Sequence, residues 1–327
     1  MASESTGKEG AALVSGRVPN PPPHLITATK KYDLHHAFVD STAWDAVLPI
    51  LRPGDLVVDT YSKAGTTWVQ AILAQLLLGV GSSAAARPHD VSPWLDVRSA
   101  VPVADRVAAL ATQSHRRFLK SHLPLDALPY SKDLKYLYIG RDARDVIVSM
   151  HNHHSNLHAD MIAKLNDLPG RVGPPLGPAP ADIVTYWREW MARDGYPWWP
   201  FWSHIRGWWA ARNRPNVLLL HYADLLGDLP AGVRRIATFL DVPLSDADLA
   251  IIVDRCSFRY MREHAADVTP GGDTLFQGGA RTFIHKGVNG RWRDVLSPAD
   301  VEAYEATAVA ELGEDCARWL REGGECA

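Results

Sequence analysis

The chain has 327 residues and a mass of 36.0 kDa, which allows one large domain or two small ones. Hydrophobic residues make up 46% of it and charged residues 22%, a balance that excludes a wholly disordered chain. There are 34 basic side chains and 37 acidic ones, so the formal net charge is −3; this argues against a protein that coats nucleic acid or an anionic membrane, but it does not exclude a local basic pocket.

The chain begins with a small, polar, proline-rich segment over residues 1–24, which we predict to be a disordered tail. This segment lacks the apolar stretch of a signal peptide. A short helix is expected from about residue 42 to residue 51. The apolar, β-branched run at 56–58 predicts a buried strand, and a helix should follow it over 66–78.

Further strands alternate with helices along the rest of the chain. The runs at 136–139 and 217–220 are apolar, as buried strands are, and 117–119 is a shorter candidate. Strands separated by helices imply parallel pairing through crossovers, so we predict one α/β domain over 25–327, with a central parallel sheet flanked by helices. The other helices are expected at 102–112, 181–193, 199–212, 230–240, 245–254 and 298–312, with one more from 146, whereas 82–100 should be loop.

One interior stretch has a biased composition. Residues 169–180 contain five prolines and three glycines, which excludes a helix or a central strand. We predict a long surface loop within the domain, of the kind that often acts as a lid or a binding loop.

The cysteines and the apolar stretches point to a cytoplasmic protein that does not insert into a membrane. Cys256, Cys316 and Cys326 are odd in number and widely spaced, so neither a zinc site nor a disulfide framework is indicated. A reducing cytoplasm is the simplest location. The longest apolar stretch, at 68–81, is shorter than the ~20 residues that a membrane-spanning helix needs.

The residues between the first strand and its helix, YSKAGTTW at 61–68, predict an anion-binding turn. Backbone N–H groups at a helix N-terminus point at an anion, Lys63 adds a positive charge, and Thr66 and Thr67 add hydroxyl donors. The nucleoside-triphosphate loop GxxxxGK[ST] is absent, because the lysine precedes the glycine here. The alternative is a helix N-cap beside a surface lysine.

Two later segments carry groups that suit proton transfer and phosphate binding. Lys120 and His122 are two residues apart on an extended segment, so they point to the same side, where the histidine can act as a general base. Arg141 lies at the carboxyl end of a strand, where open α/β sheets bind ligands, and Ser149 follows within the next helix. The alternatives are a structural histidine and a solvated helix start with salt bridges.

A fourth segment is a glycine-bearing loop with several cations, FIHKGVNGRW at 283–292. Its alternative interpretation is an ordinary basic surface loop.

In this order, the four segments resemble the cytosolic sulfotransferases, which use the donor 3′-phosphoadenosine 5′-phosphosulfate (PAPS). The family motif YPKSGTTW is matched at 61–68, K-[TS]-H-L-P at 120–124, R-[DN]-x-[RK]-D-x-x-x-S at 141–149, and RKGxxGDWK at 285–293. Lesser matches are PWLD at 93–96, YADL at 222–225 and the S-F pair at 257–258, and the resemblance runs from about residue 35 to 312.

The resemblance implies a P-loop-like three-layer fold and sulfuryl transfer from PAPS to a hydroxyl or amine of a small-molecule acceptor, without a metal. It implies that His122 is the general base, that Lys63 and Lys120 neutralise charge on the transferred and leaving groups, and that Trp94 lines the acceptor pocket. The residues implied to bind the donor are Lys63, Ala64, Gly65, Thr66, Thr67, Trp68, Arg141, Ser149, Tyr222, Ser257, Phe258, Phe283, Ile284, His285, Lys286 and Gly287.

Several departures from the family pattern concern donor affinity and assembly. His285 replaces the arginine of the closing loop, Ala64 replaces a serine, and Cys256 stands where threonine is common. A neutral imidazole holds phosphate less strongly than a guanidinium, so we expect weaker or pH-dependent donor binding. The family's dimer motif KxxxTVxxxE survives only in part, over 293–302, so a homodimer is a hypothesis.

Two clusters have no assigned role. His151, His154 and His158 would share one face if their helix extends that far, where they would line the acceptor pocket or face solvent, or, less favoured, bind a metal. Seven of the twelve tryptophans lie between residues 187 and 209, and such density favours packing over an aromatic acceptor pocket.

Two other functions compete with sulfuryl transfer. A small-molecule kinase on a related P-loop fold should show GxxxxGK[ST], which is missing. A catalytically inactive nucleotide-binding protein should have lost its base, yet His122 and Lys120 are both present.

Overall fold

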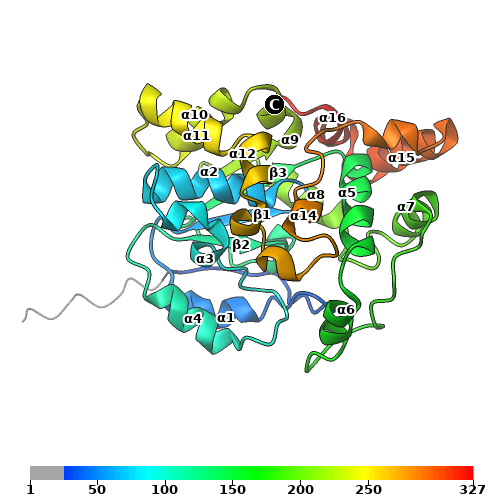
Figure 1. Cartoon of the computed structure of the whole chain (residues 1–327), viewed down its shortest axis with the longest axis horizontal. Helices are drawn as coiled ribbons and strands as arrows, with labels where there is room; N and C mark the ends of the chain where they lie inside the picture. The colour runs from blue at the N-terminus through cyan, green and yellow to red at the C-terminus, as the bar shows by residue number, and fades with distance from the viewer. Residues whose placement is uncertain (1–25, 327) are drawn as a thin grey trace, which may run out of the picture.

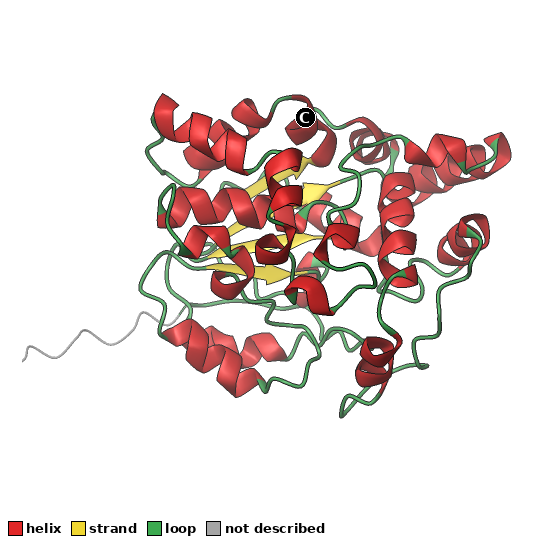
Figure 2. Ribbon diagram, viewed as in Figure 1, coloured by secondary structure: helices red, strands yellow, loops and turns green. Residues whose placement is uncertain are grey.

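A four-stranded parallel sheet forms the centre of the molecule (Figure 2). The computed structural model describes residues 26–326, so the predicted tail and the first and last residues of the predicted domain lie outside the described part. The strands are β1 (Leu56–Thr60), β2 (Phe118–Ser121), β3 (Lys135–Gly140) and β4 (Val217–His221), in the order β2-β1-β3-β4.

Helices surround this sheet (Figure 1). They are α1 (Ala43–Val47), α2 (Thr66–Leu78), α3 (Pro88–Val91), α4 (Val103–Ala111), α5 (Ala143–Ser155), α6 (Ala159–Asn166), α7 (Ile183–Ala192), α8 (Trp202–Ala210), α9 (Tyr222–Gly227), α10 (Leu229–Phe239), α11 (Asp246–Arg255), α12 (Phe258–Glu263), α13 (Ala265–Val268), α14 (Ala280–Phe283), α15 (Pro298–Leu312) and α16 (Glu314–Glu322). Short 3-10 turns cover Leu48–Ile50, Ala84–Ala86, Leu125–Ala127, Gly272–Thr274 and Arg291–Asp294.

The alternation of side chains along the strands divides the core into two halves. Val57 and Leu119 pack on one face of the sheet, against α1, α5, α7, α8, α15 and α16. Leu56 and Val58 pack on the other face, against α2, α9, α10, α11 and α12. Because both faces are covered, every strand residue except Lys135 at the start of β3 is buried, as expected for parallel sheets, and the predicted three-layer α/β fold is confirmed.

The carboxyl ends of all four strands lie at one edge of the sheet. The register pairs Asp59 with Ser121, Thr60 with Ile139, and Gly140 with His221, so each strand ends close to its neighbour's end. The chain therefore leaves every strand on the same side, and the residues that follow the strands gather there.

The predicted strands and the main helices are present, and the differences have local causes. Helix α5 begins at Ala143 rather than at 146, because the Asp142 carboxylate caps it by accepting a hydrogen bond from the Arg144 N–H. The predicted loop at 82–100 contains a 3-10 turn and the short helix α3. The helices missed by the sequence analysis include α6, α9, α12 and α16.

The expected face of three histidines does not exist, because α5 ends at Ser155 and His158 lies outside it. His151 and His154 do not line the pocket and belong to no group of described side chains placed to hold a metal: their Nε2 atoms lie 2.8 and 2.9 Å from the carbonyl oxygens of Pro180 and Gly177. The two rings thus anchor the proline-rich loop to α5.

Within residues 26–326, no group of three histidine, cysteine or acidic side chains is placed to hold a metal ion. No helix in this part of the chain is both long enough and apolar enough to cross a membrane.

A glycine at the end of β3 controls the packing of the last helix. A Cβ atom on Gly140 would lie 2.3 Å from the ring of Trp319 in α16. We expect Gly140→Ala to lower the free energy of unfolding by about 1–3 kcal/mol, since the buried indole must shift. The measurement is the midpoint of urea unfolding.

Gly207→Ala is the matched control, because the nearest atom to a Cβ on this helical glycine is 3.9 Å away. This change should be neutral or should stabilise the protein by up to about 1 kcal/mol. Equal midpoints for the two variants would contradict the role of Gly140.

Candidate functional site

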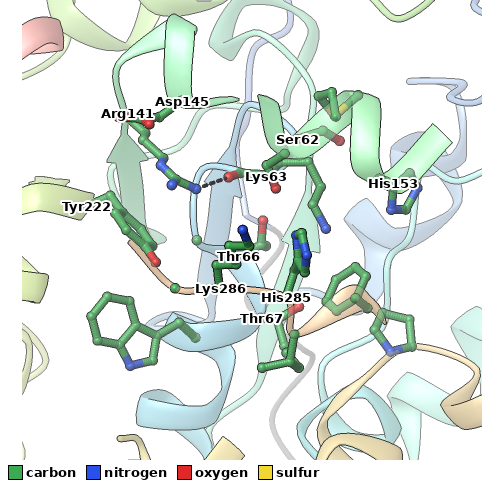
Figure 3. Close-up of a pocket in the computed structure, with 18 of the residues that line it drawn as sticks. Ser62, Lys63, Thr66, Thr67, Arg141, Asp145, His153, Tyr222, His285 and Lys286 are labelled. Carbon is green, nitrogen blue, oxygen red and sulfur yellow. Dashed lines mark hydrogen bonds between the residues drawn. The ribbon is translucent and has the colours of Figure 1, made fainter. Parts of the chain in front are cut away.

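A cavity of about 480 Å³ opens at the carboxyl edge of the sheet. Residues that follow all four strands line it: Lys63 after β1, His122 after β2, Arg141 after β3 and Tyr222 after β4. Figure 3 shows Tyr222 and His153 on opposite sides of this cavity, with Lys63 between them. The parallel sheet thus brings distant segments of the chain into one site.

The turn between β1 and α2 has the geometry of an anion cradle. Lys63 (φ 67°) and Gly65 (φ 120°) both lie in the left-handed region, which bends the backbone into the helix N-terminus. No side chain caps this end of α2, so its first N–H groups remain available to a ligand. The Thr66 hydroxyl lies 2.6 Å from that of Thr60, which ties the helix start to the strand.

Two lysines within the cavity rest on aromatic rings instead of carboxylates. Lys63 Nζ lies 3.6 Å from the centre of the Phe283 ring, and Lys120 Nζ lies 4.4 Å from that of Trp94. Neither lysine forms an ion pair with any carboxylate of the described residues. Burial, with Lys120 and Arg141 nearby, lowers the pKa of Lys63 to about 7, and burial lowers that of Lys120 to about 8.

The His122 ring is held in one orientation. Its Nδ1 lies 2.7 Å from the carbonyl oxygen of Thr60, so this nitrogen carries the proton and donates it there. The indole of Trp199 stacks on the ring at 5.6 Å, and that of Trp94 meets it edge-on at 4.8 Å. The basic Nε2 therefore remains free, and burial together with Lys120 holds the pKa of His122 well below its ordinary value.

Asp96 positions the aromatic wall beside this histidine. Its carboxylate accepts hydrogen bonds from Trp94 Nε1 at 2.5 Å, Trp44 Nε1 at 2.9 Å and the Ser121 hydroxyl at 2.6 Å. Burial raises the pKa of Asp96 to about 6. The buried network fixes Trp94 over Lys120.

Arg141 joins the turn to the loop at 284–290. It donates to the Lys63 carbonyl at 3.0 Å, the Val288 carbonyl at 3.3 Å and the Asn289 side chain at 3.1 Å. The carboxylate of Asp145 accepts the Gly290 N–H at 2.8 Å. The loop is therefore docked on the first turns of α5.

Aromatic rings and glycines form the opposite side of the cavity. Trp68 Nε1 donates to the Cys256 carbonyl at 2.7 Å, which sets the plane of its indole. Phe258 packs directly on Gly287, where an added Cβ would lie 2.3 Å from the ring. Tyr222 lies edge-on to Trp68 at 5.3 Å and carries the Arg141 guanidinium 4.0 Å above its ring.

His285 is half-buried at the mouth of this side and is uncharged. Burial, with the cations of Arg291 and Lys286, lowers its pKa from the ordinary value. Its Nδ1 is sealed from solvent and has no hydrogen-bond partner among the described residues.

The structure brings nearly all of the predicted site residues into this cavity. Ala64 is the exception, since its methyl group packs in the core. Those that line it are Lys63, Gly65, Thr66, Thr67, Trp68, Trp94, Lys120, His122, Arg141, Ser149, Tyr222, Ser257, Phe258, Phe283, Ile284, His285, Lys286 and Gly287.

Four contributors were missed by the sequence analysis. Thr60 acts through its backbone carbonyl, which no side-chain pattern reveals. Trp198 and Trp199 line the cavity, whereas the rest of the tryptophan cluster packs as predicted. His153 lies one helical turn after Ser149, and that i+4 spacing could have identified it.

This arrangement can bind a multiply charged nucleotide beside an apolar pocket. The unpaired lysines and the open helix N-terminus suit phosphate or sulfate groups, and the flat rings suit a base. A neutral imidazole with a free nitrogen stands between the two regions and can accept a proton.

Comparisons with known proteins agree with this chemistry. The family model described as Sulfotransferase domain matches residues 53–315. A glycolipid sulfotransferase of Mycobacterium bovis (strain BCG / Pasteur 1173P2) is 30% identical over 308 residues, covering 87% of this chain and 92% of the relative. Sulfotransferase 1 family member D1 of Rattus norvegicus is 26% identical, covering 83% of this chain and 88% of the relative.

Solved structures share the fold. Retinol dehydratase in complex with androsterone and the inactive cofactor PAP superposes with a TM-score of 0.65 at 24% identity, covering 84% of this chain and 87% of that one.

Proposed function

The chain belongs to the sulfotransferase family, and on that premise we propose that it transfers a sulfuryl group from PAPS to a hydroxyl or amine of a small-molecule acceptor, with His122 as general base. The observation that carries this proposal is the hydrogen bond from His122 Nδ1 to the Thr60 carbonyl. It leaves Nε2 unprotonated in the cavity, next to two lysines that have no carboxylate partner.

We propose one orientation for the donor in the cavity. The 5′-phosphosulfate would lie at the turn, where Lys63, Thr66 and Thr67 surround the open N-terminus of α2. The residues that would hold the 3′-phosphate are Arg141 and Ser149, with Ile284, His285, Lys286 and Gly287 of the docked loop. The residues that would contact the adenine are Trp68, Tyr222, Ser257 and Phe258, and Phe283 would keep Lys63 in place.

The residues of the chain divide the reaction between them. His122 Nε2 would take the proton from the acceptor hydroxyl as its oxygen bonds to sulfur. Lys63 would stabilise the charge that grows on the leaving phosphate oxygen, and Lys120 the charge on the sulfuryl oxygens. Catalysis of this kind depends on position and electrostatics, and no step in it requires a metal.

The alternatives are less well supported. The match to the sulfotransferase family argues against the kinase hypothesis. The turn at 61–68 also lacks the motif GxxxxGK[ST] that such a kinase should have. An inactive nucleotide-binding protein should have lost its base, whereas Lys120 and His122 both line the cavity.

Two further proposals concern the cellular location and the oligomeric state of the enzyme. We propose a cytoplasmic location, because Cys256, Cys316 and Cys326 are all free thiols, two of them buried. A homodimer is retained only as a hypothesis from the partial dimer motif in the sequence.

Replacing the base should separate catalysis from binding. We expect His122→Ala to lower kcat by about 10²–10⁴-fold, while the affinity for PAP changes little, because the proposal assigns His122 no contact with the nucleotide. The checks are turnover of an acceptor found by screening with labelled PAPS, and PAP binding by calorimetry. Wild-type turnover in this variant would rule out the mechanism.

Binding of the nucleotide should take up protons at alkaline pH. Lys63 has a pKa of about 7 in the free protein, so at pH 8 roughly nine-tenths of it is neutral, and a bound anion raises its pKa and protonates it. Affinity for PAP should therefore fall as the pH rises above about 7.

Calorimetry at pH 8 in HEPES and in Tris, which differ in ionisation enthalpy, measures this uptake directly. We expect Lys63 to take up about one proton for each PAP that binds, and Lys63→Met should abolish that uptake. Equal heats in the two buffers would contradict the prediction.

The closing-loop histidine offers a gain-of-affinity test. We expect His285→Arg to tighten PAP binding by about tenfold at pH 7.5, because a guanidinium is always charged and can bond a phosphate through two N–H groups. His285→Gln is the neutral control and should stay within about twofold of the wild type. Identical dissociation constants for all three proteins would show that this position does not reach the phosphate.

A further inference from the structure

His153 lies on the face of α5 that lines the cavity. Asp145, Ser149 and His153 follow one another at four-residue intervals, and all three line it. The rise of an α-helix places His153 about 6 Å beyond Ser149 along the axis. In Figure 3 it lies on the far side of Lys63 from Tyr222, which is proposed to contact the adenine.

The imidazole of His153 has no hydrogen-bond partner among residues 26–326. Its Nδ1 is sealed from solvent and makes no hydrogen bond, and neither ring nitrogen is bonded to any described residue. The neighbouring His151 and His154 are both bonded to loop carbonyls, and His122 is bonded to Thr60. Because Nδ1 is closed to the cavity, the nitrogen that a ligand can reach is Nε2, and it has no hydrogen-bond partner among the described residues.

The surroundings of His153 are apolar and aromatic. Its ring lies 5.0 Å from Phe276, 6.1 Å from Phe283 and 6.1 Å from Trp198, all edge-on. Other apolar residues that line the same cavity are Phe38, Val97, Leu157, Met161, Leu165 and Leu275. No aspartate or glutamate among the described residues lines the cavity except Asp145, which is engaged with Gly290.

His153 is an uncharged hydrogen-bonding group. Burial, together with the cations of Lys63 and Lys120, holds its pKa well below the ordinary value. A neutral imidazole offers one N–H donor and one acceptor, so it matches a hydroxyl, carbonyl or ether rather than a carboxylate.

We propose that His153 is a specificity-determining residue of the acceptor pocket: it hydrogen-bonds an uncharged second polar group on an otherwise apolar acceptor, whose reacting oxygen lies at His122. This inference rests on the proposed sulfuryl transfer and adds to it the chemical class of the acceptor. His153 takes no part in proton transfer, since the oriented base is His122.

Matched acceptors test the inference. Each pair has similar size and similar acidity of the reacting hydroxyl, and one member carries an ether oxygen: 4-butylphenol with 4-(2-methoxyethyl)phenol, 6-propyl-2-naphthol with 6-(methoxymethyl)-2-naphthol, and 1-dodecanol with 10-methoxydecan-1-ol. We expect the wild-type enzyme to favour the ether member of at least one pair by about tenfold in kcat/KM.

Two variants test whether the preference for the ether depends on a hydrogen bond from the His153 ring. His153→Phe keeps an aromatic ring without the hydrogen bond, and it should reverse the preference in favour of the apolar member. His153→Gln keeps a neutral donor and acceptor, and it should retain a preference for the ether. A residue that only packed would affect both members of a pair equally.

The outcomes distinguish this inference from the proposed function. If the wild type showed no preference in any pair, or if His153→Phe kept the preference, His153 would have no such role while sulfuryl transfer stood. If none of the compounds were turned over, the acceptor class would be wrong. PAP binding by calorimetry, expected within twofold of the wild type in both variants, then shows whether the donor site itself has failed.

Discussion

The in-register parallel pairing of four strands is the constraint on which the site depends. The carboxyl ends of parallel strands lie at one edge of the sheet, and here each of the four strands is followed at that edge by a residue of the candidate site. The turn with Lys63, the histidine at 122 and the arginine at 141 are remote in sequence, yet the register alone brings them to a common cavity. Even the tautomer of His122 follows from the sheet, because its partner is the last carbonyl of the neighbouring strand.

The charges in the cavity show how the protein prepares for an anionic ligand. Desolvation lowers the pKa of both lysines below its value in water. Their ammonium groups contact aromatic faces where carboxylates would otherwise neutralise them. A carboxylate at these positions would stabilise the empty protein but compete with the ligand. The arrangement therefore lowers the stability of the free protein but raises its affinity for an anionic ligand. The hydrogen bonds to Asp96 hold the aromatic side chains of the cavity in place.

Much of the fold and most of the cavity lining could be predicted from the sequence, for identifiable reasons. Buried strands are short apolar runs, and α2 has the predicted bounds because glycines lie at both of its ends. The N-terminus of α5 was misplaced because the capping carboxylate of Asp142 acts before the apolar pattern begins. The roles of Thr60, Trp199, His151 and His154 could not be predicted, because each depends on a contact with a distant segment.

The positions of the tryptophans allow ligand binding in the cavity to be followed by intrinsic fluorescence. Of the twelve indoles in the chain, Trp68, Trp94, Trp198 and Trp199 line the cavity, two of them against the His122 ring. Most of the others are buried in the core, and Trp209 and Trp292 are partly buried outside the cavity lining. We therefore expect a bound ligand to change the emission of the four lining indoles more than that of the others.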